Sequence, residues 1–223
     1  MQKEIKISLP LYKIAYAGCF TVILGLIRGI TFSSEIGIAS EAPMAILAAV
    51  FCADTYTQEI TSHRSEIWRL YSAKRKIRSV LGRLAVSEIF LFFLAVTGYG
   101  LFYLFQHPRT LNGMQESVGA EIKQFAVYLG AATVTLVFWG VLANTISSLF
   151  RSMWVGMGAS LGIWLVTNSS TGDKWFGAWN LFSYTFRDLE NSGDYSWIYG
   201  KLLCMFLTFC MLAFQPGLLK RRG

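Results

Sequence analysis

The chain has 223 residues, of which 54% are hydrophobic and only 15% are charged. Soluble domains usually carry about a quarter charged residues, so this composition excludes an ordinary soluble domain and indicates a membrane protein. The net charge of +7 would by itself suggest nucleic-acid binding, but the apolar background argues against a nucleic-acid partner.

A helix needs about 20 mostly apolar residues to cross a bilayer core about 30 Å thick. Six stretches meet or nearly meet that length, and the second of them is interrupted by Glu41 and Pro43. No small-residue cleavage site follows the first stretch, so we expect it to remain in the protein. The predicted spans are residues 14–31, 36–56, 80–106, 125–150, 153–168 and 195–214. The sequence thus predicts an all-α polytopic membrane protein with six transmembrane helices and a single domain over residues 1–223.

Most of the twenty Lys and Arg residues fall on one side of these spans. Because cytoplasmic loops hold an excess of Lys and Arg, both termini are predicted to be cytoplasmic. This orientation places a cytoplasmic loop at residues 57–79 and an outer segment at residues 168–194. The predicted location is the cytoplasmic membrane of a bacterial cell.

Seven of the Lys and Arg residues lie within residues 62–83. On a helix, the apolar residues from Ile60 to Tyr71 share one arc and mixed charges occupy the other, which predicts a short amphipathic helix along the membrane. A basic patch from Lys74 to Arg83 follows it. A mixed-charge face suits a protein partner, although the run can also act only as a topology signal beside anionic lipids.

Residues 51–90, FCADTYTQEITSHRSEIWRLYSAKRKIRSVLGRLAVSEIF, resemble the permease subunits of type-2 ABC exporters. The shared features are an acid at the inner end of the second span, the amphipathic helix, the basic patch and the third span. The resemblance implies that two copies, or this chain and a related permease, pair with separate ATPase subunits. It also assigns contact with the ATPase to Asp54, Glu59, Arg64, Glu66, Trp68 and Arg69.

The chain departs from this family at Ser72, Ala73 and Lys74, where members often have a proline and an arginine. Many members also begin with a longer interfacial helix, whereas only about ten residues precede the first span here and Pro10 limits any helix. The chain has no GxxxxGK[ST] phosphate loop. We therefore expect no enzyme activity and no cofactor in this chain itself, with ATP and Mg²⁺ bound by the ATPase subunit.

Glycines on two spans suggest close helix contacts, because small residues let membrane helices approach each other. Gly25 and Gly29 form a GxxxG pair near Gly18 on the first span, and Gly158 and Gly162 lie on the fifth. Such faces can pack within one chain. The resemblance implies instead that the two faces meet between two copies.

Several polar residues lie inside the predicted spans. Glu88, about 7 Å deeper than Arg83 along a helix, is predicted either to pair with Arg83 or a neighbouring helix, or to handle substrate or protons. Asn144 is predicted to form interhelical hydrogen bonds. Arg28 and Lys201 are expected to snorkel to the outer surface. The four cysteines lie in apolar stretches and only two histidines occur, so we expect no disulfide and no metal site.

The outer segment is rich in aromatic residues, which favours anchoring at the membrane interface. The resemblance adds short re-entrant helices between the last two spans. The resemblance implies that the chain is the transmembrane subunit of an ATP-driven exporter for a hydrophobic or amphipathic substrate, such as a peptide, a drug or a lipid-like molecule. Two alternatives stay open: a membrane-embedded immunity or scaffold protein, and an intramembrane enzyme, which the absence of GxSxG and HExxH motifs disfavours.

Overall fold

The described part of the chain is helical, with turns between the helices. The computed structural model describes residues 2–58, 71–109, 118–187 and 195–221. Within these ranges no strand occurs, and Phe32 and Arg109 form an isolated parallel bridge that joins two loops. The prediction of an all-α fold is confirmed.

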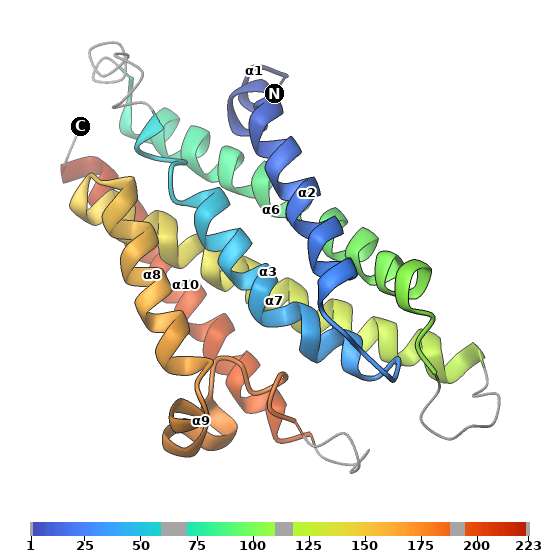
Figure 1. Ribbon diagram of the computed structural model, residues 1–223. Coiled ribbons are helices and arrows are strands. Elements are labelled where there is room, and N and C mark those ends of the chain that lie inside the picture. The colour runs from blue at the N-terminus through green and yellow to red at the C-terminus, as the bar shows by residue number, and fades with distance from the viewer. Residues whose placement is uncertain (1, 59–70, 110–117, 188–194, 222–223) are drawn as a thin grey trace.

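The helices form one elongated bundle (Figure 1). In chain order they are α1 Gln2–Ser8, α2 Leu11–Ile27, α3 Glu35–Cys52, α6 Ala73–Gln106, α7 Val118–Phe150, α8 Met153–Thr167, α9 Ser170–Phe176, the 3₁₀ helix η1 Gly177–Trp179, and α10 Trp197–Arg221.

Four of these helices are long and apolar enough to cross a membrane, namely α3, α6, α7 and α10. Helices α2 and α8 are also apolar but shorter, with 17 and 15 residues. The chain is therefore a helical membrane protein by length and composition of its helices. Six crossings and cytoplasmic termini remain predictions.

Helix α2 ends before the predicted end of the first span because the chain turns at Arg28, whose backbone is extended. The Gln106 side chain, at the end of α6, donates to the carbonyl oxygens of Gly25 and Arg28, both at 2.7 Å. It also accepts a hydrogen bond from the Ile30 N–H at 2.8 Å. Gln106 thus satisfies backbone groups that a helix end otherwise leaves unpaired.

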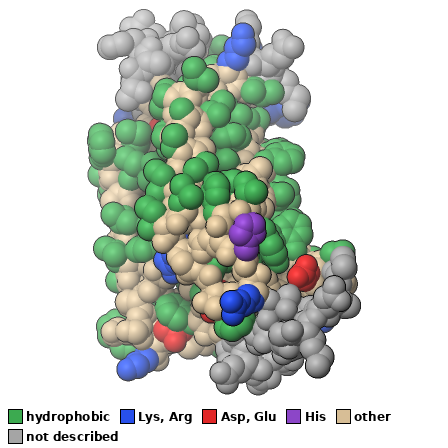
Figure 2. Space-filling model, turned by 45° about the vertical axis from the view of Figure 1, so that its right-hand side comes forward, with side chains coloured by type: hydrophobic (Ala, Val, Ile, Leu, Met, Phe, Trp, Pro, Cys, Tyr) green, Lys and Arg blue, Asp and Glu red, His purple; other side chains and the backbone are tan. Residues whose placement is uncertain are grey.

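Helices α3 and α7 form the centre of the bundle (Figure 1). Helix α7 also packs against α8 and α10, whereas α2 packs mainly on α6. Trp139, Phe51 and Leu91 are fully buried between the helices. On the face in Figure 2, hydrophobic side chains cover the middle and the described charged side chains lie toward the two ends. Such an exposed apolar band fits a surface that faces lipid.

Both ends of the chain lie at the same end of the bundle, which we call the terminal end; the opposite end is the far end (Figure 1). At the far end, the short helices α9 and η1 follow α8. Residues 180–187, called the inserted segment below, then place Phe182 and Tyr184 in the interior with no exposed surface. Short helices therefore lie between α8 and α10, while their re-entrant course in a membrane stays a prediction.

Candidate functional site

A buried ion pair lies beneath the inserted segment. The Lys201 ammonium of α10 pairs with the Glu41 carboxylate of α3, and their side chains are only 5% and 0% exposed. A charge inside a membrane protein is costly unless it is paired and hydrogen-bonded, so every donor and acceptor of this pair has to be accounted for.

Three residues from two elements complete the hydrogen bonding of the pair. The Thr135 hydroxyl of α7 accepts from Lys201 Nζ at 2.8 Å and donates to Glu41 Oε1 at 2.7 Å. The inserted segment supplies the Leu181 carbonyl, 3.0 Å from Lys201 Nζ, and the Thr185 hydroxyl, 2.5 Å from Glu41 Oε2. All three ammonium protons and both carboxylate oxygens therefore have partners.

Two glycines give the inserted segment room to enter the bundle. A Cβ atom on Gly200 would overlap the Asn180 carbonyl oxygen and the Ser183 hydroxyl. A Cβ atom on Gly37 would lie 2.5 Å from the Tyr184 hydroxyl oxygen. Only glycine permits so close an approach of backbone and side chain at both places.

Aromatic contacts hold the inserted segment between α7, α8 and α10. The Phe182 ring stacks on Trp139 with centroids 5.5 Å apart and an interplanar angle of 15°, and meets Trp164 edge-on at 6.4 Å. The Tyr184 ring meets Trp197 edge-on at 5.1 Å. Burial raises the pKa of the Tyr184 phenol above its ordinary value, so this side chain stays neutral. The inserted segment is therefore packed as part of the hydrophobic core.

The aromatic residues of the predicted outer segment therefore divide into two groups. Trp175 and Trp179 are 73% and 55% exposed, as expected for residues that anchor at an interface, while Phe182 and Tyr184 are buried. Lys201 is buried in its ion pair, so the prediction that it snorkels to the surface is wrong. Arg28 is exposed at the end of α2.

A second ion pair lies near the terminal end. Lys13 Nζ of α2 is 2.5 Å from Asp54 Oδ1, in the turn after α3. It also donates to the Phe51 carbonyl oxygen at 3.0 Å and lies 4.9 Å from the Phe51 ring centroid. Asp54, the acid that the resemblance assigns to coupling, is 15% exposed and is bonded to Lys13. The other five residues predicted for coupling, Glu59, Arg64, Glu66, Trp68 and Arg69, lie outside the described residues.

The predicted polar residues Glu88 and Asn144 both lie in the interior. Glu88 Oε1 accepts a hydrogen bond from Cys52 Sγ at 3.6 Å and occupies the space that a Cβ on Gly140 would take, whereas Glu88 Oε2 has no partner among the described residues. The Asn144 side chain is fully buried, and neither its nitrogen nor its oxygen is hydrogen-bonded within the described ranges. The carboxylate of Glu88 and the amide of Asn144 therefore lie between helices and away from the surface of the bundle.

The five glycines predicted for a dimer interface differ in their surroundings. Gly25 packs within the chain, since a Cβ there would lie 3.4 Å from Leu101 Cβ of α6. Gly18, Gly29, Gly158 and Gly162 have nothing within 4 Å of such a Cβ. Gly29 lies beyond the end of α2, so the Gly25–Gly29 pair does not share one helix.

Two grooves flank α3 on its two sides. The groove between α2 and α3 has a volume of about 480 Å³, and the groove between α3 and α8 has a volume of about 320 Å³. Trp139, Ser160 and Trp164 line the second groove. The Trp139 indole nitrogen and the Ser160 hydroxyl have no hydrogen-bond partner in the described part of the chain. Because Trp139 and Trp164 both touch Phe182, this groove adjoins the inserted segment.

No family model, curated protein or solved structure matches the chain. In the described residues no group of three His, Cys, Asp or Glu side chains could hold a metal ion. Fold and site thus define a helical membrane protein with a buried charge pair under an inserted segment. Sequence reasoning missed this pair, although an acid and a base inside two apolar stretches were a signal that they bind each other.

Proposed function

We propose that the chain is the transmembrane subunit of an ATP-driven exporter, working with a separate ATPase subunit and a second copy or a related permease in a bacterial cytoplasmic membrane. The resemblance over residues 51–90 supports this proposal. So does the order of the elements, in which a hydrophilic stretch separates α3 from α6 and short helices separate α8 from α10.

The observation that carries the proposal is the hydrogen-bonded Glu41–Lys201 pair beneath the inserted segment. Charged residues inside membrane proteins commonly mark substrate or ion pathways. Here the charges bind a segment that fills the far end of the bundle, and the aromatic residues below that segment line an apolar groove. For transport, the segment has to leave this position while a hydrophobic or amphipathic substrate passes.

The ATPase subunit is expected to contact the chain through the mixed-charge stretch between α3 and α6. Reversing the charges, with Glu66→Arg and Arg69→Glu, should abolish substrate-stimulated ATP hydrolysis by the purified complex in proteoliposomes. The matched control is Lys123→Glu, which reverses an exposed charge on α7 near the far end. Undiminished stimulation in the double variant, or purification from the native membrane with no ATPase subunit, would contradict the proposal.

A further inference from the structure

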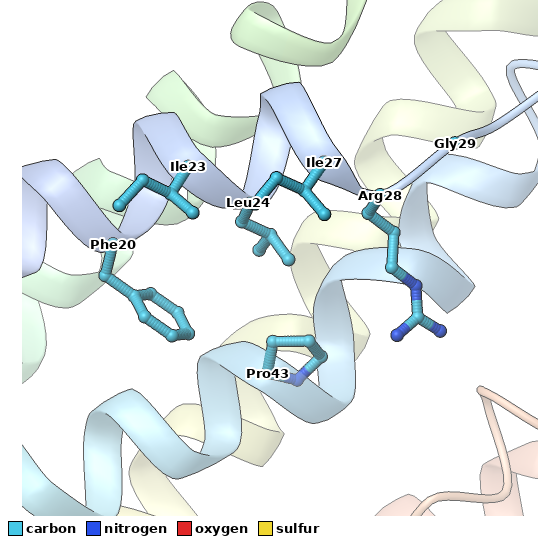
Figure 3. Close-up of a pocket in the computed structure, with 7 residues that line it drawn as sticks. All are labelled: Phe20, Ile23, Leu24, Ile27, Arg28, Gly29 and Pro43. Atoms are coloured by element: carbon cyan, nitrogen blue, oxygen red, sulfur yellow. The ribbon is translucent and has the colours of Figure 1, made fainter.

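The groove between α2 and α3 has an apolar wall and a charged end. Phe20, Ile23, Leu24 and Ile27 of α2 face Pro43 of α3 across it (Figure 3). Arg28 follows directly at the end of α2, and its side chain extends toward α3. A volume of about 480 Å³ is large enough for part of a lipid-sized molecule.

The Arg28 guanidinium has neither an ion pair nor a hydrogen bond with any described residue. Two acids of the neighbouring helix α3 already have other partners. The Glu35 carboxylate accepts from the backbone N–H groups of Thr31 and Phe32, at 2.7 and 3.1 Å. Glu41 is bound by Lys201 and two threonine hydroxyls. Among the described residues no acid neutralises Arg28, which leaves its charge available to an anion.

The length of the groove and the position of Arg28 at its end match an amphiphile that has a charged headgroup and an apolar tail. Helix α2 has 17 residues and so is about 25 Å long, close to the thickness of a bilayer core, with Arg28 just beyond its last turn. The wall from Phe20 to Ile27 extends about 10 Å deeper along the helix axis. A headgroup bound at Arg28 would place an acyl chain along this wall.

We propose that this groove binds one anionic phospholipid, with its phosphate paired to Arg28 and one acyl chain against Phe20, Leu24 and Ile27. Guanidinium and phosphate form charge-assisted, two-pronged hydrogen bonds. None of the described residues that line the groove is acidic, so its described lining offers no partner for the ammonium group of a zwitterionic lipid. The binding does not depend on the proposed transport function and stands if that function is wrong.

The test is native mass spectrometry of the full chain in a non-ionic detergent, with phosphatidylglycerol and phosphatidylcholine of identical acyl chains. We expect phosphatidylglycerol to bind at least about tenfold more tightly than phosphatidylcholine, and Arg28→Gln to remove that preference. Arg28→Lys should keep most of it. Lys123→Gln, which removes another exposed cation at the far end, should bind phosphatidylglycerol like the unmodified chain.

Competition separates a lipid site from a simple phosphate site. Glycerol phosphate carries the headgroup chemistry without the tail, so it should not displace phosphatidylglycerol at equal concentration. Three results would overturn the proposal: equal binding of the two lipids, unchanged phosphatidylglycerol binding by Arg28→Gln, or full displacement by glycerol phosphate. Retained helical circular dichroism would show that a loss of binding by Arg28→Gln is not a loss of fold.

Discussion

The two buried ion pairs use the same kinds of charged groups but join different parts of the protein. Lys13 and Asp54 connect α2 to the turn after α3, and Asp54 retains 15% exposure. Glu41 and Lys201 have almost none, and their hydrogen bonds join α3, α7, α10 and the inserted segment. How much the fold depends on an ion pair is therefore decided by the access of water to the pair and by the number of elements that it connects.

The largest effect is expected at the far end. Lys201→Met leaves the Glu41 carboxylate buried without its counter-charge, which should lower the free energy of unfolding by about 3–5 kcal/mol. Unfolding in detergent, followed by tryptophan fluorescence, measures this loss. The double variant Glu41→Leu with Lys201→Met removes both charges and should recover most of the stability. A double variant that loses the sum of the two single losses would show that the charges act independently.

A somewhat smaller effect is expected for Phe182→Ala, which keeps the ion pair and removes the ring that packs on Trp139 and Trp164. Truncating a fully buried phenylalanine should cost about 3 kcal/mol in the same unfolding measurement. The matched control is Phe209→Ala, because Phe209 is 72% exposed on α10 and should cost little. Equal losses for the two variants would mean that the inserted segment is not packed as core.

The smallest effect is expected at the terminal end. Asp54→Asn keeps a hydrogen-bond acceptor for Lys13, which also retains the Phe51 carbonyl oxygen. The Lys13 side chain is only 5% exposed, but Asp54 is 15% exposed and the amide keeps one acceptor for Lys13, so the loss should be about 2 kcal/mol, below that of Lys201→Met. A loss as large as that of Lys201→Met would remove the distinction between the two pairs.

The helices could be predicted from the sequence because long apolar stretches have few stable alternatives in a membrane. Their ends were less predictable. Helix α2 stops at Ile27, where the chain turns at Arg28 and Gln106, which is distant in sequence, binds the carbonyl oxygens of Gly25 and Arg28. Local sequence does not encode such a contact.

The candidate site was harder to predict than the helices. Glu41 and Lys201 are 160 positions apart, and the rule that intramembrane charges pair names no particular partner. The aromatic residues of the inserted segment were ambiguous for a different reason. Tryptophan, tyrosine and phenylalanine suit both a membrane interface and a packed interior, so composition alone did not separate Trp175 from Phe182.

We infer above all that the Glu41–Lys201 pair holds the inserted segment inside the bundle. The most direct test of this role is the rate at which a water-soluble thiol reagent labels Ser183→Cys, a position only 6% exposed, with Cys19 and Cys210 replaced by alanine. We expect slow labelling in the otherwise intact chain and labelling about tenfold faster when Lys201→Met is added, while the exposed control Trp175→Cys reacts rapidly in both. Labelling of Ser183→Cys at the same rate with and without Lys201→Met would contradict the role of the ion pair.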